Sequence, residues 1–296
     1  MTATAGTVAP THHGKAGFRH AFAAEWTKLR SVRSTWICIA IIVVASLGLS
    51  ALVTNLEAGR WTTLSLGERA RFDPVRFSQS GVFISQFVVG VLGAMVVTAE
   101  YSTGLIRTTL TAVPHRFNVL IAKKAVLAML LLVVGEISAF ASFFLGQAIL
   151  LGHGGKALST NASIISQVTA HNIPVVSITS PGVLRAVVLS GLYLVILSVL
   201  ALGIGFIVRS TAGAISLFVG VLLVIPLIIN ILPSSISNSI EPYLPSNLGL
   251  AMVVTTTRQT DFAGTLLGPW WAFLTLVIYA IVVVGIGAWL FQKRDA

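Results

Sequence analysis

Charged residues are scarce in this chain. Only 9% of its 296 residues are Asp, Glu, Lys or Arg, whereas soluble domains average about 25%. Hydrophobic residues make up 55% of the chain, and the mean hydropathy is +0.92. This composition excludes one large soluble domain of ordinary kind and indicates a polytopic membrane protein.

Cysteine and the common motifs of nucleotide and zinc chemistry are also lacking. The single cysteine, Cys38, excludes an intrachain disulfide. The sequence contains neither a G-x-x-x-x-G-K-[S/T] phosphate loop nor an H-E-x-x-H zinc motif. The segment HGGKALST (153–160) comes near the phosphate loop, but Ala157 follows its lysine and Leu150 stands where the first glycine is required. We therefore predict a non-catalytic chain that itself holds no cofactor and no metal.

Six apolar runs are long enough to cross a bilayer, which takes about 20 residues per helix. They cover about 35–56, 81–98, 125–151, 183–208, 214–232 and 270–291. The predicted fold is an all-α polytopic membrane protein in which residues 1–15 form a disordered cytoplasmic tail and 16–296 form a single six-span transmembrane domain. An even number of spans places both termini on one side of the membrane.

The distribution of basic residues predicts which side that is. If both termini are cytoplasmic, twelve of the 19 Lys and Arg residues lie in inner segments and seven lie in outer loops. Such a bias follows the positive-inside rule. The net charge of +10 is then explained by bases at span ends that meet anionic lipid, so no nucleic-acid partner is expected.

A basic aromatic segment, AGFRHAFAAEWTKLRSVRS (16–34), precedes the first span. Its apolar side chains recur at helical spacing on one face, and charged side chains flank them. The residues concerned are Phe18, Phe22, Glu25, Trp26, Lys28, Leu29, Arg30 and Arg33. We predict an interfacial helix with its apolar side in lipid; the alternative is a helix whose apolar face packs on protein.

A second charged stretch, AEYSTGLIRTTLTAVPHRFNVLIAKK (99–124), separates the second and third spans. Gly104 permits a sharp turn, and Pro114 disfavours helical geometry in the residue before it. The intervening LIRTTLTAV (105–113) fits a short cytoplasmic helix parallel to the membrane, placed where a partner can push it. The alternative is a solvated loop with anchoring charges.

One carboxylate falls inside a predicted span. Glu136 lies near the middle of the third span, where a charge is costly and marks a functional hypothesis. It either lines the transport path, binds a cation or carries a proton, or it is a structural residue packed against another helix. Small residues suited to close helix contact accompany it in the third and fourth spans: Gly135, Ala139, Ser142, Gly146, Gly191, Ser198 and Gly205. In the fifth span, Pro226 and Asn230 predict a kink.

Several segments resemble the ABC-2-type permeases, the transmembrane subunits of ABC transporters, in their actinobacterial (high-GC Gram-positive) form. They are EWTKLRSVRSTW (25–36), EYSTGLIRTTLTAVPHR (100–116), VRSTAGAISL (208–217) and FQKRDA (291–296), together with YLP (243–245) ahead of PWW (269–271). The resemblance extends from about residue 18 to the end of the chain.

The resemblance implies a multi-pass permease of the bacterial plasma membrane that pairs with a second copy or a paralogue and docks on a separate ATPase, where ATP and Mg would bind. The implied ATPase-contact residues are Glu100, Thr103, Gly104, Arg107, Pro114 and Arg116. The expected function is that of the permease subunit of an exporter. The alternative is an ion-coupled secondary transporter that uses Glu136.

Overall fold

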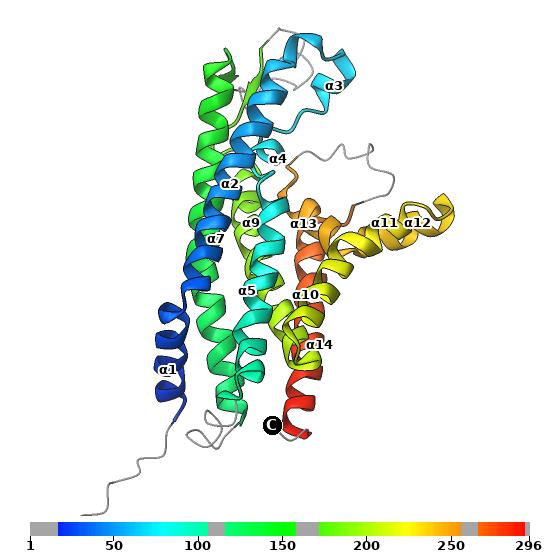
Figure 1. The fold of residues 1–296 in the computed structure, drawn as a ribbon. Helices are drawn as coiled ribbons and strands as arrows, with labels where there is room; N and C mark the ends of the chain where they lie inside the picture. Colours follow the sequence, from blue (N-terminus) through cyan, green and yellow to red (C-terminus); the bar gives the residue numbers. More distant parts are fainter. Residues whose placement is uncertain (1–16, 106–115, 158–171, 256–265, 294–296) are drawn as a thin grey trace, which may run out of the picture.

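The computed structural model describes residues 17–105, 116–157, 172–255 and 266–293, which form a bundle of long helices (Figure 1). Six helical segments are long and apolar enough to cross a membrane: Arg33–Gly59, Val82–Ser102, Asn118–Gly152, Val183–Val208, Thr211–Ile229 and Pro269–Lys293. The prediction of an all-α, six-span membrane protein is confirmed. The predicted tail at 1–15, and all but the first residue of the predicted helix at 105–113, lie outside the described residues.

The long helices are α1 (Phe18–Ser31), α2 (Arg33–Gly59), α5 (Val82–Ser102), α7 (Arg116–Gly152), α9 (Val183–Val208) and α14 (Pro269–Lys293). The fifth span is divided into α10 (Thr211–Val219), the π-helical turn η2 (Gly220–Val224) and α11 (Ile225–Ile229). Shorter elements are η1 (Trp61–Thr63), α3 (Leu66–Ala70), α4 (Pro74–Ser78), α12 (Ser234–Ile240), η3 (Glu241–Tyr243) and α13 (Pro245–Val253), with one two-residue parallel pair, β1 (Lys156–Ala157) and β2 (Pro174–Val175).

Helix α9 forms the centre of the bundle. In its most apolar window 78% of the residues are buried, compared with 22% for α14 and for the fifth span. Helices α5, α7 and α14 pack along α9, and α2 packs on α5 and α7. Because lipid is as apolar as the helix surfaces, shape complementarity rather than water exclusion must hold this arrangement together.

Small residues provide that complementarity at the crossings with α9. A Cβ atom on Gly135 of α7 would lie 3.2 Å from the carbonyl oxygen of Gly191, and one on Gly205 would lie 3.2 Å from that of Ala94. A Cβ atom on Gly93 of α5 would collide with the carbonyl oxygen of Ser198. Gly135, Gly191, Ser198 and Gly205 therefore lie at the contacts among α5, α7 and α9, whereas Gly146 faces Ser78 of α4.

Two spans extend beyond their predicted limits. Helix α5 continues past residue 98 through Glu100 to Ser102, and α7 begins at Arg116 rather than near residue 125. The apolar run stops at the first charged side chains, but the helices do not, because Glu100 and Lys123 pair with each other. Charge alone is thus a poor marker of a helix end.

The fifth span contains an irregularity close to the predicted kink. Pro226 lies in the first turn of α11, directly after the π-helical turn η2. Proline lacks an N–H group and clashes with the carbonyl four residues earlier, and a wider turn relieves both problems. The span ends at Ile229 instead of residue 232, and α11 and α12 lean away from the rest of the bundle (Figure 1).

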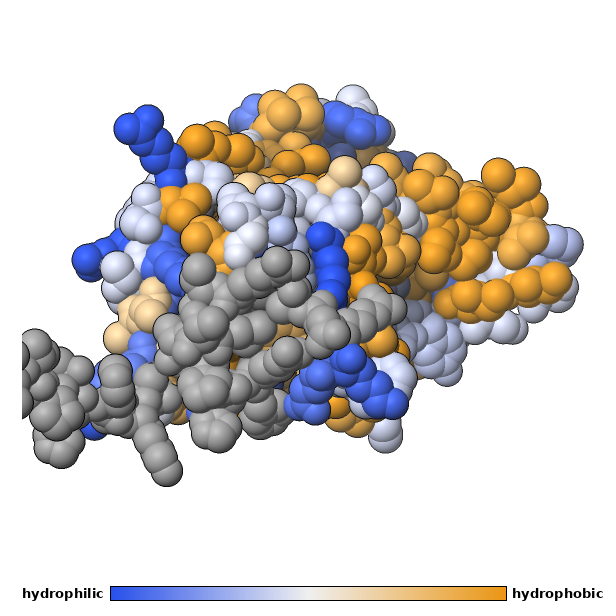
Figure 2. All heavy atoms as spheres, turned by 60° about the horizontal axis from the view of Figure 1, so that its bottom comes forward, coloured by the Kyte–Doolittle hydropathy of each residue, from blue (hydrophilic) through white to orange (hydrophobic). Residues whose placement is uncertain are grey.

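The bundle has two distinct ends. Helix α1 and the last turn of α14 lie at one end, called here the terminal end, and α3 lies at the other, the distal end (Figure 1). Viewed from the terminal end, hydrophilic residues gather around that end and hydrophobic residues cover the sides (Figure 2). An even number of spans requires the first and last described helices to share an end, as α1 and α14 do (Figure 1).

Candidate functional site

Four charged side chains meet at the terminal end, where α1, α5 and α7 come together. Lys123 Nζ lies 2.8 Å from Glu25 Oε2 and 2.6 Å from Glu100 Oε1. Lys28 Nζ lies 3.2 Å from Glu25 Oε1 and 2.9 Å from Glu100 Oε1. Each base thus contacts both acids. Glu25, Lys28, Glu100 and Lys123 are called the charge cluster below.

Burial makes these ion pairs mutually dependent. The side chain of Lys123 is 1% exposed, and those of Glu25 and Glu100 are 6% and 9% exposed. A buried charge without a partner is strongly destabilising, so Glu25, Glu100 and Lys123 require one another. Lys28 is 41% exposed. Burial lowers the pKa of its amine, but the hydrogen bond to Glu100 and the charge of Glu25 outweigh that effect and raise the pKa overall.

Helix α1 places Glu25 and Lys28 by packing against α7. Ala21, Glu25 and Leu29 recur every four residues and form its buried face. Ala21 packs with Val119 and Ala122 of α7. Phe18, in the first turn of the helix, is 41% exposed.

This face packs on protein, as the alternative sequence interpretation proposed. The interfacial role of the outward side of α1 stays a prediction. Of the other residues predicted for this helix, Phe22 and Trp26 are half-buried and Arg30 is exposed. Arg30 accepts a 2.9 Å hydrogen bond at its carbonyl from Trp36 Nε1, and Arg33 begins α2.

The predicted ATPase-contact residues occupy different positions. Glu100 is buried in the charge cluster. Thr103 caps the end of α5 and donates a 2.8 Å hydrogen bond to the carbonyl oxygen of Ala99. Gly104 has a φ of +72°, the left-handed conformation that glycine favours after a helix. Arg116 is the first residue of α7. Arg107 and Pro114 lie outside the described residues.

A cavity of about 400 Å³ adjoins the charge cluster. It is lined by the charge cluster, by Ser34 and Thr35 of α2 and by apolar side chains that come mainly from α5. Glu100 Oε2 is buried there with no hydrogen-bond partner among the described residues. The cluster therefore borders open space at the terminal end instead of being sealed inside the bundle.

Glu136 lies apart from this cluster, between α7 and α9. Both of its carboxylate oxygens are buried, and neither has a hydrogen-bond partner in the described part of the chain. A Cβ atom on Gly191 would lie 2.6 Å from the carboxyl carbon of Glu136, so the glycine makes the space that this side chain occupies. Glu136 thus packs against α9, as the structural alternative proposed, but its carboxylate forms no hydrogen bond with any described residue.

A buried polar network that the sequence analysis missed links α7, α9 and the start of α5. Gln79 Nε2 donates to the carbonyl oxygen of Ala139 at 2.8 Å, and Ser190 Oγ donates to Gln79 Oε1 at 3.0 Å. Tyr193 donates its hydroxyl hydrogen to Gln86 Oε1 at 2.6 Å. Glutamines within or beside apolar runs were the available signal, since an unpaired amide in a membrane is costly.

A second polar group that sequence reasoning missed lies at the distal end. Asp73 begins α4 and accepts hydrogen bonds from the backbone N–H groups of Val75 and Arg76, at 3.0 and 3.2 Å. It also accepts 2.8 Å and 3.0 Å bonds from the N–H and hydroxyl groups of Thr255. Arg185 of α9 donates to the neighbouring carbonyl oxygen of Val254 at 3.0 Å.

We call Asp73, Arg185, Val254 and Thr255 the distal cluster. No group of three or more His, Cys, Asp or Glu side chains in the described ranges is arranged to hold a metal ion.

These features define a multi-pass helical membrane protein with a charge-lined terminal end. A family model described as ABC-2 family transporter protein matches residues 21–190, more than half of the chain. The chain belongs to this family, so it is an ABC-2-type membrane permease. The match includes all four members of the charge cluster and reaches Ser190 in α9. No characterised protein matches the sequence.

Proposed function

We propose that this permease is the transmembrane subunit of an ATP-driven exporter and works as a dimer with a separate ATPase. The observation that carries the proposal is the charge cluster, which joins α1 to α5 and α7, the two helices that flank residues 103–115. The chain has no phosphate loop of its own. ATP and Mg would therefore bind to the partner ATPase, and the second permease is another copy or a paralogue.

The terminal end faces the cytoplasm in this proposal. The positive-inside count supports that orientation, because the inner segments hold twelve of the 19 basic residues. The hydrophilic residues gathered at this end also suit contact with a soluble partner (Figure 2). The protein would then reside in the bacterial plasma membrane with both termini inside the cell.

The charge cluster gives a physical route for a push on residues 103–115. Lys123 bridges the ends of α5 and α7 through Glu100, so these helices move together. The same lysine pairs with Glu25, which carries the displacement to α1. Closure of an ATPase pair could in this way tilt α5 and α7 against α9 and change which side of the membrane the transport path opens to.

Glu100 has a positioning role in this scheme. It is 7% exposed, so we assign it to holding α5 and α7 behind the contact surface. Thr103, Gly104, Arg107, Pro114 and Arg116 are kept as the proposed ATPase contacts. Export is the direction of transport that the family resemblance implies.

The test is copurification of the tagged, full-length permease from its native host in mild detergent. We expect an ATPase subunit in near-equal amount, reduced by Arg107→Ala and by Lys123→Met. Arg60→Ala, at the distal end, should leave recovery unchanged. A permease that copurifies with no ATPase in any detergent would overturn the proposal.

The second candidate is an ion-coupled transporter, favoured by one observation: the buried carboxylate of Glu136 has no partner among the described residues. Its test is proton flux into proteoliposomes that contain the permease alone. Flux that disappears in Glu136→Gln would support this candidate. Absence of flux, or flux that persists in the variant, would exclude it.

A further inference from the structure

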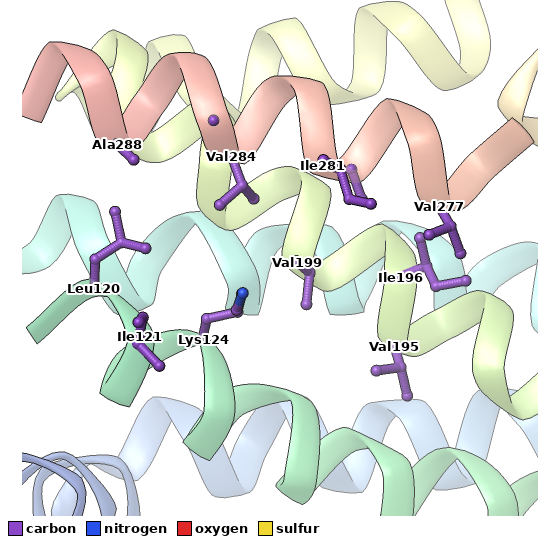
Figure 3. Close-up of a pocket in the computed structure, with 12 residues that line it drawn as sticks. Leu120, Ile121, Lys124, Val195, Ile196, Val199, Val277, Ile281, Val284 and Ala288 are labelled. Atoms are coloured by element: carbon purple, nitrogen blue, oxygen red, sulfur yellow. The ribbon is translucent and has the colours of Figure 1, made fainter. Parts of the chain in front are cut away.

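A groove of about 380 Å³ runs along the outside of the bundle between α7 and α14, with α9 as its floor. Eleven of its twelve lining residues are apolar, and Lys124 supplies the one charge. Figure 3 shows Lys124 reaching from α7 into the space between the helices, with Val199 of α9 and Val284 of α14 nearby. The volume is within the range of small-molecule sites.

The groove exists because α7 and α14 both pack tightly on α9 but only loosely on each other. Glycine contacts bring each helix onto α9: Gly135 meets Gly191, and a Cβ atom on Gly287 would lie 3.0 Å from the carbonyl oxygen of Gly203. On the groove side, by contrast, a Cβ atom on Gly285 would have no neighbour within 4 Å. The space is a product of helix packing and is open to the membrane.

Lys124 gives the groove a single cationic point close to the terminal end of the bundle. Its neighbour Lys123 points the other way into the charge cluster, because successive helical residues diverge by about 100° around the axis. Lys124 itself forms no hydrogen bond or ion pair with any described residue and is half-buried. Figure 3 shows Lys124 about one helical turn in from Leu120 and Ala288, and the longer part of the groove runs from Lys124 along α14 as far as Val277, with apolar side chains throughout.

We propose that this groove binds an anionic phospholipid, with the phosphate at Lys124 and an acyl chain along α9 and α14. Basic pockets between transmembrane helices are suited to anionic headgroups. A second copy of the chain fits less well, because the described carboxylates at the terminal end, Glu25 and Glu100, are both engaged in the charge cluster. A helix from such a copy would leave the Lys124 amine facing apolar side chains, whereas a lipid phosphate neutralises it.

This proposal does not depend on the ATPase. It requires only a membrane-embedded chain, so it stands whether or not the exporter proposal holds. The lipid would fill the groove between α7 and α14 and couple the position of α14 to that of α7, which the direct contacts between these helices do only weakly.

The experiment is photolabelling of the full-length permease in nanodiscs, using phosphatidylglycerol that carries a diazirine in its acyl chain. We expect labelled peptides from α9 around Val195–Val199 and from α14 around Val277–Gly285. Lys124→Gln should lower the labelling about fivefold, the effect of removing one cation near an anionic headgroup. Lys124→Arg should restore it, and the control Lys293→Gln, also at the terminal end, should leave it unchanged.

A second variant tests the groove independently of its charge. Gly285→Phe places a side chain in the open space and should abolish labelling in α9, while Gly48→Phe is the matched control. Gly48 is likewise a helical glycine with no neighbour within 4 Å of a built Cβ atom, but it lies on α2. Equal labelling by a phosphatidylcholine probe, or no response to Lys124→Gln and Gly285→Phe, would overturn the proposal.

Discussion

The two ends of the bundle are held by different kinds of polar contact. At the terminal end, four charged side chains from α1, α5 and α7 pair with one another. At the distal end, Asp73 accepts its hydrogen bonds largely from backbone N–H groups, and Arg185 donates to a backbone carbonyl. Long side chains that share partners can exchange them as helices shift. Backbone groups that are fixed in helices and turns cannot exchange their hydrogen-bond partners in this way.

The difference indicates that the distal end is held rigidly and that the helices of the terminal end can shift relative to one another. The distal cluster fixes α4, α9 and the segment after α13 relative to one another. The charge cluster joins helices whose relative positions can change while every charge keeps a partner. A permease driven from its terminal end needs both properties, and the predictions below test them from the largest expected effect to the smallest.

Lys123→Met should have the largest effect on stability. It leaves Glu25 and Glu100 buried together with only the half-exposed Lys28 to neutralise them, and breaking a buried ion pair costs about 3–5 kcal/mol. The measurement is the free energy of unfolding in mixed detergent micelles. Lys124→Met is the matched control and should change it little, because Lys124 lies outside the charge cluster. Equal effects of the two variants would remove the distinction between these neighbouring lysines.

Asp73→Ala should lower the free energy of unfolding by about 2 kcal/mol, because it removes the N-cap of α4 and leaves Thr255 without its acceptor. The loss should be local to the distal end, so copurification of an ATPase should persist. Asp73→Asn keeps an acceptor oxygen and should cost less. Loss of the ATPase in Asp73→Ala, at a temperature where the variant stays folded, would contradict the division between the two ends.

Thr255→Val should have a smaller effect, about 1 kcal/mol. It removes the hydroxyl that donates to Asp73 Oδ1 and keeps the backbone N–H that donates to Oδ2. Unfolding of Thr255→Val, of Asp73→Ala and of the double variant forms a thermodynamic cycle. Strictly additive losses would show that the two side chains are not coupled.

Lys28→Gln should have the smallest effect, about 0.5 kcal/mol, because its ion pairs are part-exposed to solvent. The pKa of Lys28 is raised by its acidic partners above the ordinary value of 10.5. Its stabilising contribution is therefore fully present below that value and is lost as the pH rises through the raised pKa. The difference between wild type and variant should stay constant at neutral pH and vanish in strong alkali. If wild type and variant still differ in their free energy of unfolding in strong alkali, the charge of Lys28 is not the source of the difference.

Local pattern was sufficient for much of the fold and insufficient for the site. Apolar runs predicted the six spans, and small residues predicted the contacts at Gly135, Gly191 and Gly205. The contact of α1 with α7 was not predicted, because the sequence analysis defined the helix by its aromatic side chains, whereas Ala21 and Glu25 are the residues that meet α7. The distal cluster went unpredicted because Asp73 and Thr255 lie far apart in the chain and neither belongs to a recognisable motif.

The sequence by itself determined the membrane-spanning class, the family and the lack of a phosphate loop, because these depend on composition, local periodicity and motif content. Only the tertiary structure decided that Lys123 joins Glu25 to Glu100 while Lys124 faces a groove. The two lysines are adjacent and chemically identical in the sequence. Their side chains leave α7 in different directions. Lys123 therefore meets α1 and α5, whereas Lys124 meets the space between α9 and α14, and only the packing of these helices creates that difference.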